Sequence, residues 1–388
     1  MPGKRIALFL DGTWNTVKSN TNVWRMKSLC INTADQITYY SAGVGTLFGQ
    51  RLIGGMFGYG LDQEVIQAYM WLMAQYDEGD RIFIFGFSRG AFTARSLAGL
   101  ISKCGLLKSG SPVSITQLYD RYKKGTSPHT IRELAHVKAS DLKPEDHLIA
   151  KYSMAVPIWF QGVWDTVGAL GVPFGEIPFI SRSNYGFLET DLRINDTRAF
   201  HALAIDEHRP DFTPTLWTRS VKKGAGPSDT YPPRPLDQVE QRWFVGAHAD
   251  VGGGYENGML AQIPLNWLMQ KAGSHGLVFK GEMSIDGTEF QSPIHDSFSE
   301  MAHGVYKLSK FGVRYFRTVG AGPIEDGDSI TTTINETIDA SVFERYRNDT
   351  SYRPRNIRAW ASKAEKSGVS IDSISSSVLA DSPGASVS

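Results

Sequence analysis

The sequence predicts an α/β fold, in which a mostly parallel central sheet is flanked by helices. Short, unbroken apolar runs at residues 5–10 and 82–85 are typical of strands that are buried on both faces. Segments whose apolar residues recur with helical spacing, at 62–76 and 91–104, lie between these runs and a strong strand predicted at 156–164. The 388 residues are enough to bury a large core, in one large domain or two smaller ones.

Composition and charge argue against several classes of protein. Hydrophobic residues make up 41% and charged residues 21% of the chain, which is ordinary for a globular protein. The 40 basic residues balance 40 acidic ones, so no nucleic-acid partner is indicated. Cys30 and Cys104 are the only cysteines, and two cysteines in apolar settings make neither a disulfide scaffold nor a metal site. We therefore expect no metal and no other cofactor.

The chain contains no obvious targeting or membrane segment. The apolar run before Asp11 is too short for a signal peptide. No run approaches the roughly 18 apolar residues that span a membrane. We therefore expect a cytoplasmic protein without signal peptide or transmembrane segment, and secretion by a route that needs no signal peptide stays open.

The first predicted strand, at residues 5–10, ends in the turn-forming sequence DGTWN at 11–15. A strand followed by Asp-Gly-Thr also occurs in phosphatases with an aspartyl nucleophile. Those enzymes need a second Asp two positions earlier, where this chain has Phe9. The alternative is a loop that lends a backbone N–H, from Gly12 or Thr13, to an oxyanion hole whose second donor is the N–H of Arg89.

Two glycine-punctuated apolar loops, at 43–60 and 169–180, have two interpretations. The first loop carries seven glycines among large apolar residues that include Phe48, Met56 and Phe57. It is either a mobile wall or lid, whose apolar side chains line the substrate site, or a buried irregular connection. The first interpretation predicts transient contact with a membrane surface.

Residues 81–104 place a serine between a buried strand and a helix, in the sequence GFSRG at 86–90. This is the context of the nucleophile elbow, G-x-S-x-G, which presents the Oγ of Ser88 at a strained turn. Gly86 and Gly90 remove side chains that would clash where strand and helix pass each other. The helix N-terminus directs positive partial charge at the reaction centre. The competing interpretation is a glycine-rich turn that merely packs.

The rest of the chain supplies the insertion, a further helix and the tail. Residues 109–151 are polar and weakly periodic, which favours a partly helical insertion. The spacing of apolar residues predicts a helix over 188–208, where four polar residues would pack or support the site: His201, Asp206, Glu207 and His208. We expect one domain over 1–360 and a disordered, Ser-rich tail over 361–388.

Serine needs a general base and an acid that orients the base. In hydrolases with this elbow the three residues follow in the order Ser, Asp or Glu, His, each at a strand end. Ser88, Asp165 and His248 meet both conditions. Asp250 is the rival acid, but it lies only two residues beyond His248, and a zinc site of His248, Asp250 and His201 lacks a supporting motif.

Four long motifs resemble an α/β-hydrolase family that includes the first class of type VI secretion lipase effectors and many uncharacterised bacterial and fungal proteins. The motifs are LFLDGTWN at 8–15, GDRIFIFGFSRGA at 79–91, GVWDTVGALG at 162–171 and GAHADVGGGY at 246–255. HALAIDEHRPDFTPTLW at 201–217 and YRPRN at 352–356 are also similar to that family. The resemblance implies the α/β-hydrolase fold, phospholipase activity and a triad of Ser88, Asp165 and His248.

We therefore expect a serine hydrolase that cleaves carboxylic esters of lipids through an acyl-enzyme, with a lipid or other acyl ester as its partner. Two alternatives stay open: an esterase or thioesterase that acts on a soluble acyl substrate, and a hydrolase-fold binding module without turnover.

Overall fold

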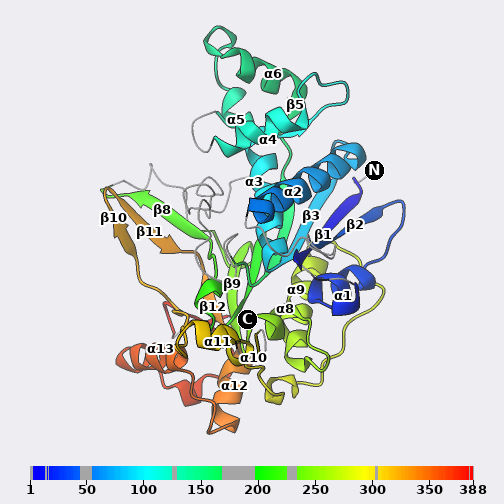
Figure 1. Ribbon diagram of the computed structural model, residues 1–388. Coiled ribbons are helices and arrows are strands. Elements are labelled where there is room, and N and C mark those ends of the chain that lie inside the picture. The colour runs from blue at the N-terminus through cyan, green and yellow to red at the C-terminus, as the bar shows by residue number, and fades with distance from the viewer. Residues whose placement is uncertain are drawn as a thin grey trace.

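The computed structural model describes residues 3–13, 15, 17–43, 55–124, 129–167, 197–224, 234–301, 305–383 and 385–387. Its centre is a nine-stranded sheet with the strand order β14-β13-β12-β9-β7-β6-β3-β1-β2 (Figure 1). The strands of this sheet are β1 (Arg5–Thr13), β2 (Gln36–Gly43), β3 (Arg81–Phe87), β6 (Ile158–Trp164), β7 (Ala199–Ala204), β9 (Val239–Phe244), β12 (Glu336–Ile338), β13 (Ser377–Leu379) and β14 (Ser386–Val387).

The sheet is parallel from β2 to β12, and only β13 and β14 pair antiparallel at its end. The mostly parallel sheet predicted from the sequence is confirmed. Helices cover both faces of the sheet (Figure 1). The longer ones are α1 (Asn22–Leu29), α2 (Gly55–Gln75), α3 (Arg89–Cys104), α9 (Gln262–Ser274), α12 (Ala340–Asn348) and α13 (Arg355–Lys366).

Alternation along β1 and β3 divides the core into two layers. Ile6, Leu8 and Ile84 pack with apolar residues of α2 and α3. Phe9 and Phe85, which point the other way, pack with residues of α1 and α9. Because successive side chains of a strand alternate between faces, a strand covered on both sides has to be apolar throughout. This explains the unbroken apolar runs in the sequence.

The segment expected to be a helical insertion contains α4 (Ile115–Lys123), α5 (Ile131–Leu134) and α6 (Pro144–Tyr152). It projects at the top of Figure 1. Ser114 and Thr130 begin α4 and α5 with capping boxes, and buried Arg121 ties α4 to Asp146 of α6 at 2.6 Å. Such caps explain how a weakly periodic, polar segment holds short helices.

The remaining elements are short. A three-stranded sheet has the order β10-β11-β8, and β4 pairs with β5. The strands are β4 (Leu106–Leu107), β5 (Ser153–Met154), β8 (Thr218–Lys222), β10 (Ile324–Asp326) and β11 (Ser329–Thr333). The helices are α8 (His248–Gly252), α10 (Ser297–Glu300) and α11 (Val305–Ser309). Single 3₁₀ turns are η1 (Val17–Ser19), η2 (Ala139–Asp141), η3 (Pro210–Phe212), η5 (Met259–Ala261), η6 (Glu289–Gln291) and η8 (Ile371–Ser373).

The helix predicted over 188–208 is wrong in its described part. Residues 199–204 form β7, between β6 and β9. All six residues of β7 are buried and five of them are apolar, and a short buried run of that kind fits a strand or a buried helix equally well. Residues 188–196 lie outside the described residues.

The disordered tail predicted over 361–388 is also wrong for the described residues. Helix α13 continues to Lys366, and β13 pairs with β12. The tail has few large apolar residues, but Ile371, Ile374 and Val378 are all buried in one cluster with residues of α12 and α13. Composition failed here because a few well-placed apolar side chains are enough to attach a segment to a core that already exists.

Parts of the two glycine-punctuated loops lie outside the described residues. This holds for Phe48 and for all of 169–180. Gly55–Gly60 belongs to α2, so this part of the first loop is helical and not an irregular connection. The side chains of Met56 and Phe57 lie outside what the structure describes. The substrate-lining role of these side chains therefore stays a prediction.

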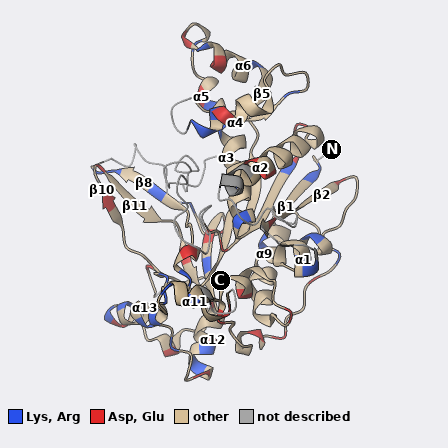
Figure 2. Cartoon of the chain, in the orientation of Figure 1, with Lys and Arg blue, Asp and Glu red and all other residues tan. Residues whose placement is uncertain are grey.

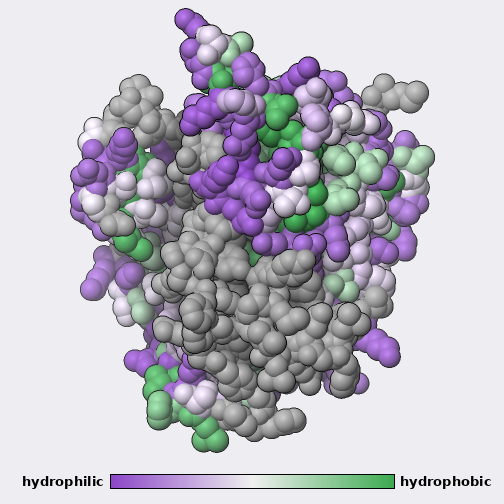
Figure 3. All heavy atoms as spheres, turned by 45° about the horizontal axis from the view of Figure 1, so that its top comes forward, coloured by the Kyte–Doolittle hydropathy of each residue, from purple (hydrophilic) through white to green (hydrophobic). Residues whose placement is uncertain are grey.

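Basic and acidic residues are interspersed over the described part of the chain (Figure 2). On the face drawn in Figure 3, hydrophobic residues form separate groups among hydrophilic ones. Within the described ranges, every helix is too short or too polar to cross a bilayer.

Deleting residues 371–388 tests whether the tail is part of the core. The deletion removes β13, β14 and the buried side chains of Ile371, Ile374 and Val378. Burying one such side chain is worth roughly 1.5–3 kcal/mol. We expect the free energy of unfolding, measured by urea denaturation, to fall by about 3 kcal/mol or more. An unchanged unfolding curve would show that the tail does not contribute to the core.

Candidate active site

Ser88 lies in the turn between β3 and α3, with φ 59° and ψ −122°. A positive φ is uncommon for a residue other than glycine and marks a strained turn. A Cβ on Gly86 would lie 2.4 Å from the carbonyl oxygen of Gly90, and a Cβ on Gly90 would lie 2.2 Å from that of Leu10. Both glycines are therefore required by close backbone approach, and Ser88 lies in the strained turn between strand and helix that the sequence predicted.

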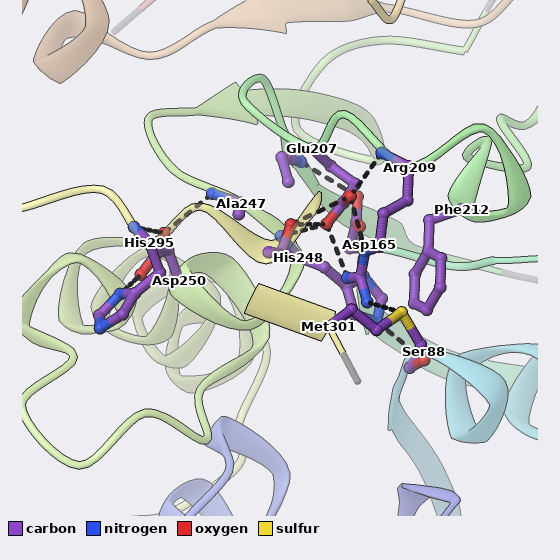
Figure 4. A network of polar contacts seen from close by, with 12 residues as sticks. Ser88, Asp165, Glu207, Arg209, Phe212, Ala247, His248, Asp250, His295 and Met301 are labelled. Atoms are coloured by element: carbon purple, nitrogen blue, oxygen red, sulfur yellow. Dashed lines mark hydrogen bonds and ion pairs between the residues drawn. The ribbon is translucent and has the colours of Figure 1, made fainter. Parts of the chain in front are cut away.

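Ser88, His248 and Asp165 form one continuous hydrogen-bonded chain (Figure 4). His248 Nε2 lies 2.8 Å from Ser88 Oγ, and His248 Nδ1 lies 2.6 Å from Asp165 Oδ2. The three residues follow β3, β9 and β6, respectively. Because these strands are parallel, their carboxyl ends meet at one edge of the sheet. The structure thus brings together the three residues that the sequence singled out.

The Asp165 carboxylate is fully buried and accepts hydrogen bonds from three residues. His248 Nδ1 contacts Oδ2, the Ala204 N–H donates to Oδ1 at 3.0 Å, and the Arg317 guanidinium donates to both oxygens, at 2.6 and 2.9 Å. Burial raises the pKa of the Asp165 carboxyl, but Arg317 and His248 outweigh burial and hold that pKa well below its usual range. The lowered pKa favours the ionised carboxylate.

His248 is held between aromatic rings and a second carboxylate. The ring centroids of Phe87 and Phe212 lie 4.6 and 5.0 Å from that of His248. The backbone N–H of His248 donates to Glu207 Oε2 at 3.2 Å. Burial lowers the pKa of His248 below its ordinary 6.5, although Asp165 acts in the opposite direction. The imidazole is therefore neutral at pH 7 and can accept a proton.

Glu207 and Arg209 form a buried ion pair beside His248 (Figure 4). Arg209 Nη2 donates to Glu207 Oε2 at 2.7 Å, and its guanidinium stacks on the ring of Phe212 at 3.5 Å from the centroid. Burial raises the pKa of Glu207, but Arg209 outweighs it and lowers the pKa to about 2. The sequence indicated Glu207 as a helix residue, whereas it lies in the loop after β7.

Asp206, His201 and His208, the other polar residues that the sequence singled out between 201 and 208, form hydrogen bonds to the segments around the site. Asp206 accepts hydrogen bonds from the Gly246 N–H at 2.8 Å and from the Tyr352 hydroxyl at 3.1 Å. These contacts fix the loop that precedes His248. His201, in β7, accepts the Thr166 N–H at Nε2, at 3.0 Å, and thereby fixes the residue after Asp165. His208 is bonded to the backbone oxygen of Tyr315 at 3.0 Å.

The rival acid, Asp250, faces away from His248. Its Oδ1 lies 2.7 Å from His295 Nδ1, and its Oδ2 accepts the N–H of Ala247 at 3.0 Å and that of His295 at 3.1 Å. These hydrogen bonds of Asp250 hold the backbone on either side of the site in place, and none of them goes to the His248 imidazole. His248, Asp250 and His201 each have separate partners, and the described residues contain no group of three His, Cys, Asp or Glu placed to hold a metal ion.

The carboxyl end of β1, which contains Asp11 and Gly12, lies beside the serine. A Cβ on Gly12 would lie 3.3 Å from Ser88 Cβ. The Gly12 N–H, however, donates to Asp11 Oδ1 at 2.7 Å, so this predicted oxyanion donor is already engaged. Asp11 Oδ2 also accepts bonds from Thr21 Oγ1 and the Tyr40 hydroxyl, at 2.6 and 2.9 Å. These hydrogen bonds of the buried Asp11 carboxylate fix the backbone at the end of β1.

The other two predicted oxyanion donors belong to two different elements. Thr13 is the last residue of β1 and Arg89 the first of α3. Their backbone N–H groups stay the predicted donors.

Comparison with known proteins identifies the family to which the chain belongs. A family model described as "T6SS, Phospholipase effector Tle1-like, catalytic domain" matches residues 4–271. The chain belongs to this family. The resemblance stated from the sequence motifs is thereby confirmed, and with it the α/β-hydrolase fold.

Individual relatives are more distant. An uncharacterized protein of Saccharomyces cerevisiae, YEL023C, is 32% identical over 236 residues, which cover 56% of this chain and 33% of the yeast protein. An uncharacterized protein from Pseudomonas aeruginosa has a crystal structure that is 18% identical, with a TM-score of 0.46, over 94% of this chain and 58% of that one. The Tle1 effector, solved bound to the VgrG spike, is 21% identical with a TM-score of 0.34 over 66% of this chain and 51% of its own. This chain spans about a third of the length of the yeast relative.

Several residues of the site escaped the sequence analysis. Arg317 belongs to no motif that the sequence analysis named, and it acts by pairing with a carboxylate that is distant in the sequence. Arg209 lies in the same motif at 201–217 as its partner Glu207, but nothing in that motif indicates an ion pair beside His248.

Proposed function

We propose that this chain is a serine hydrolase that cleaves carboxylic esters of lipids, with phospholipids as the preferred class, through a Ser88–His248–Asp165 triad. The observation that carries the proposal is the unbroken hydrogen-bonded chain from Ser88 Oγ through His248 to Asp165. Membership of a phospholipase effector family supports the lipid substrate. The neutral His248 and the ionised Asp165 are in the protonation states that this chemistry requires.

In the first half of the reaction, His248 Nε2 takes the proton of Ser88 Oγ as the oxygen attacks the ester carbonyl carbon. Backbone N–H groups of Arg89 and Thr13 would stabilise the oxyanion that forms. The tetrahedral intermediate collapses when the bond to the leaving alcohol breaks, and the imidazolium returns its proton to that alcohol. The acyl group is then bound to Ser88.

In the second half, water replaces the alcohol. His248 takes a proton from the water, which attacks the acyl carbon, and the breaking bond releases the carboxylic acid as Ser88 recovers its proton. Throughout, Asp165 accepts the Nδ1–H of His248, so that Nε2 is the nitrogen free to accept a proton, and it stabilises the imidazolium.

An exposed apolar group fits transient contact with a lipid surface. Leu308, Phe311 and Val313 are 76%, 94% and 68% exposed, in the last turn of α11 and the residues just after it. Exposed Lys307 lies beside them in the sequence. Large apolar side chains next to basic ones are typical of proteins that lie on anionic lipid surfaces.

Replacing Ser88 with alanine should remove nearly all ester hydrolysis, on the order of 10⁴-fold or more, because no nucleophile is left. Free fatty acid released from mixed phospholipid vesicles, measured by mass spectrometry, is the readout. Ser96→Ala in α3, whose hydroxyl donates to the Phe92 carbonyl oxygen, is the matched control and should keep full activity. Equal activity of both variants would overturn the proposal. Hydrolysis of soluble esters without phospholipid cleavage would favour the esterase alternative.

The two candidate acids should differ sharply. Asp165→Asn should lower kcat by about 10³–10⁴-fold, because the asparagine amide favours the wrong tautomer of His248. Asp250→Asn should lower it less than about tenfold, because Asp250 contacts His295 and backbone N–H groups. Steady-state kinetics on one ester measures both. The reverse ranking would mean that Asp250 is the acid.

The lowered pKa of His248 predicts the acid limb of the pH profile. Protonation of the imidazole removes the general base, so kcat/KM should fall as the pH falls through the pKa of the free enzyme's His248. Because that pKa lies below 6.5, the half-maximal point should also lie below 6.5. A half-maximal point above pH 7 would contradict the described surroundings of His248.

A further inference from the structure

Arg317 reaches the site from the C-terminal part of the chain. It lies outside the residues 4–271 that match the family model, between α11 and β10. The Tyr315 N–H donates to the His208 carbonyl oxygen at 2.9 Å, and the Tyr315 oxygen is bonded to the His208 ring at 3.0 Å. These bonds fix the Arg317 backbone against the loop that follows β7.

The Arg317 guanidinium is saturated on the side that faces Asp165. Nη1 donates to Asp165 Oδ1 at 2.6 Å and to the Ala204 carbonyl oxygen at 2.7 Å. Nη2 donates to Asp165 Oδ2 at 2.9 Å and to the Phe212 carbonyl oxygen at 2.6 Å. Arg317 is only 1% exposed. A planar fork with two parallel bonds fixes the plane of a carboxylate, which a single point charge does not.

We propose that Arg317 is a positioning residue of the hydrolase, which holds the plane of the Asp165 carboxylate so that Oδ2 faces His248 Nδ1, and which balances the buried negative charge of that carboxylate. The inference rests on the proposed function of the triad. It also implies that the segment around Arg317 completes a site whose other residues lie in the family-matched part of the chain.

The net charge around Asp165 and His248 depends on all the titratable groups that face these two residues. Asp165 faces Arg317 and His248, and His201 of β7 lies behind it with Arg95 of α3 nearby. His248 also faces Glu207, which Arg209 neutralises. Two acids, Asp165 and Glu207, and two arginines, Arg317 and Arg209, therefore lie beside the neutral imidazole of His248. A third arginine, Arg95, acts on the neutral His201.

Removing the Arg317 charge leaves a fully buried carboxylate whose remaining hydrogen-bond partners are His248 and the neutral Ala204 N–H. Such a pair lowers its energy by retaining a proton, either on the imidazole or on the carboxyl. Both outcomes remove the base that Ser88 needs. The dyad should then titrate at higher pH than in the wild type, by about one pH unit or more, because a charge within about 4–6 Å shifts a pKa by 1–3 units.

A merely structural role makes a different prediction. Arg317 also joins the carbonyl oxygens of Ala204 and Phe212, so its loss will lower stability in any case. Arg121 is the matched control, since it is equally buried and binds Asp146 and the His129 carbonyl oxygen within the α4–α6 segment. Arg121→Met should lower stability without moving the pH profile.

The experiment compares Arg317→Met, Arg317→Lys and Arg121→Met with the wild type. Circular dichroism and thermal unfolding establish which variants fold. The pH dependence of kcat and KM on a soluble ester measures function. Titration of ¹⁵N-labelled histidine by NMR, with His248 assigned from a His248→Gln variant, follows the dyad without any turnover.

For Arg317→Met we expect kcat to fall about 10²–10³-fold with KM changed less than about threefold, and the His248 titration midpoint to rise by about one unit. Arg317→Lys keeps the charge but not the fork, so kcat should fall about tenfold while the midpoint stays near that of the wild type. If Arg317→Met does not fold, a wild-type kcat in Arg317→Lys overturns the inference. So does an unmoved midpoint in folded Arg317→Met. If the wild type hydrolyses no ester, the function fails, and the NMR midpoints still decide the role of Arg317.

Discussion

The site depends on how a fully buried carboxylate is kept ionised. Isolated from water, the negative charge of Asp165 would cost several kcal/mol unless it is paired and hydrogen-bonded. His248, Arg317 and the Ala204 N–H supply that compensation, from three segments far apart in the sequence. Without one of these partners, the Asp165 charge would lie in apolar surroundings with too few hydrogen bonds. The hydrogen bonds of Asp165 and Arg317 therefore hold the loops at this edge of the sheet and also orient Asp165 toward His248.

Close packing of the backbone is the second constraint on this edge. The strained turn at Ser88 can form only because Gly86 and Gly90 let α3 and β1 approach within distances that a Cβ forbids. The parallel order of β3, β6 and β9 then brings their carboxyl ends, and the residues after them, to one place. Steric constraints thus fix the position of Ser88, and electrostatic interactions determine the protonation of His248 and Asp165.

Local features explain what the sequence could predict and what it could not. The strained turn at Ser88 and the meeting of Ser88, Asp165 and His248 were predictable because turn chemistry, strand ends and chain order can be read along the sequence. Arg317 was not predictable, because its role exists only through contacts with segments more than 100 residues away. The strand at 199–204 was mistaken for a helix because burial on all sides removes the periodicity that distinguishes the two.

The central claim is that Ser88 is a nucleophile activated by His248 within a charge-balanced site. Its most direct measurement is the covalent adduct formed with an alkyl fluorophosphonate, located by intact mass and peptide mapping. We predict one adduct per chain, on Ser88, formed quickly by the wild type at pH 7 and lost in His248→Ala, which folds but lacks the base. An adduct on another residue, or equal labelling of the wild type and His248→Ala, would contradict this account.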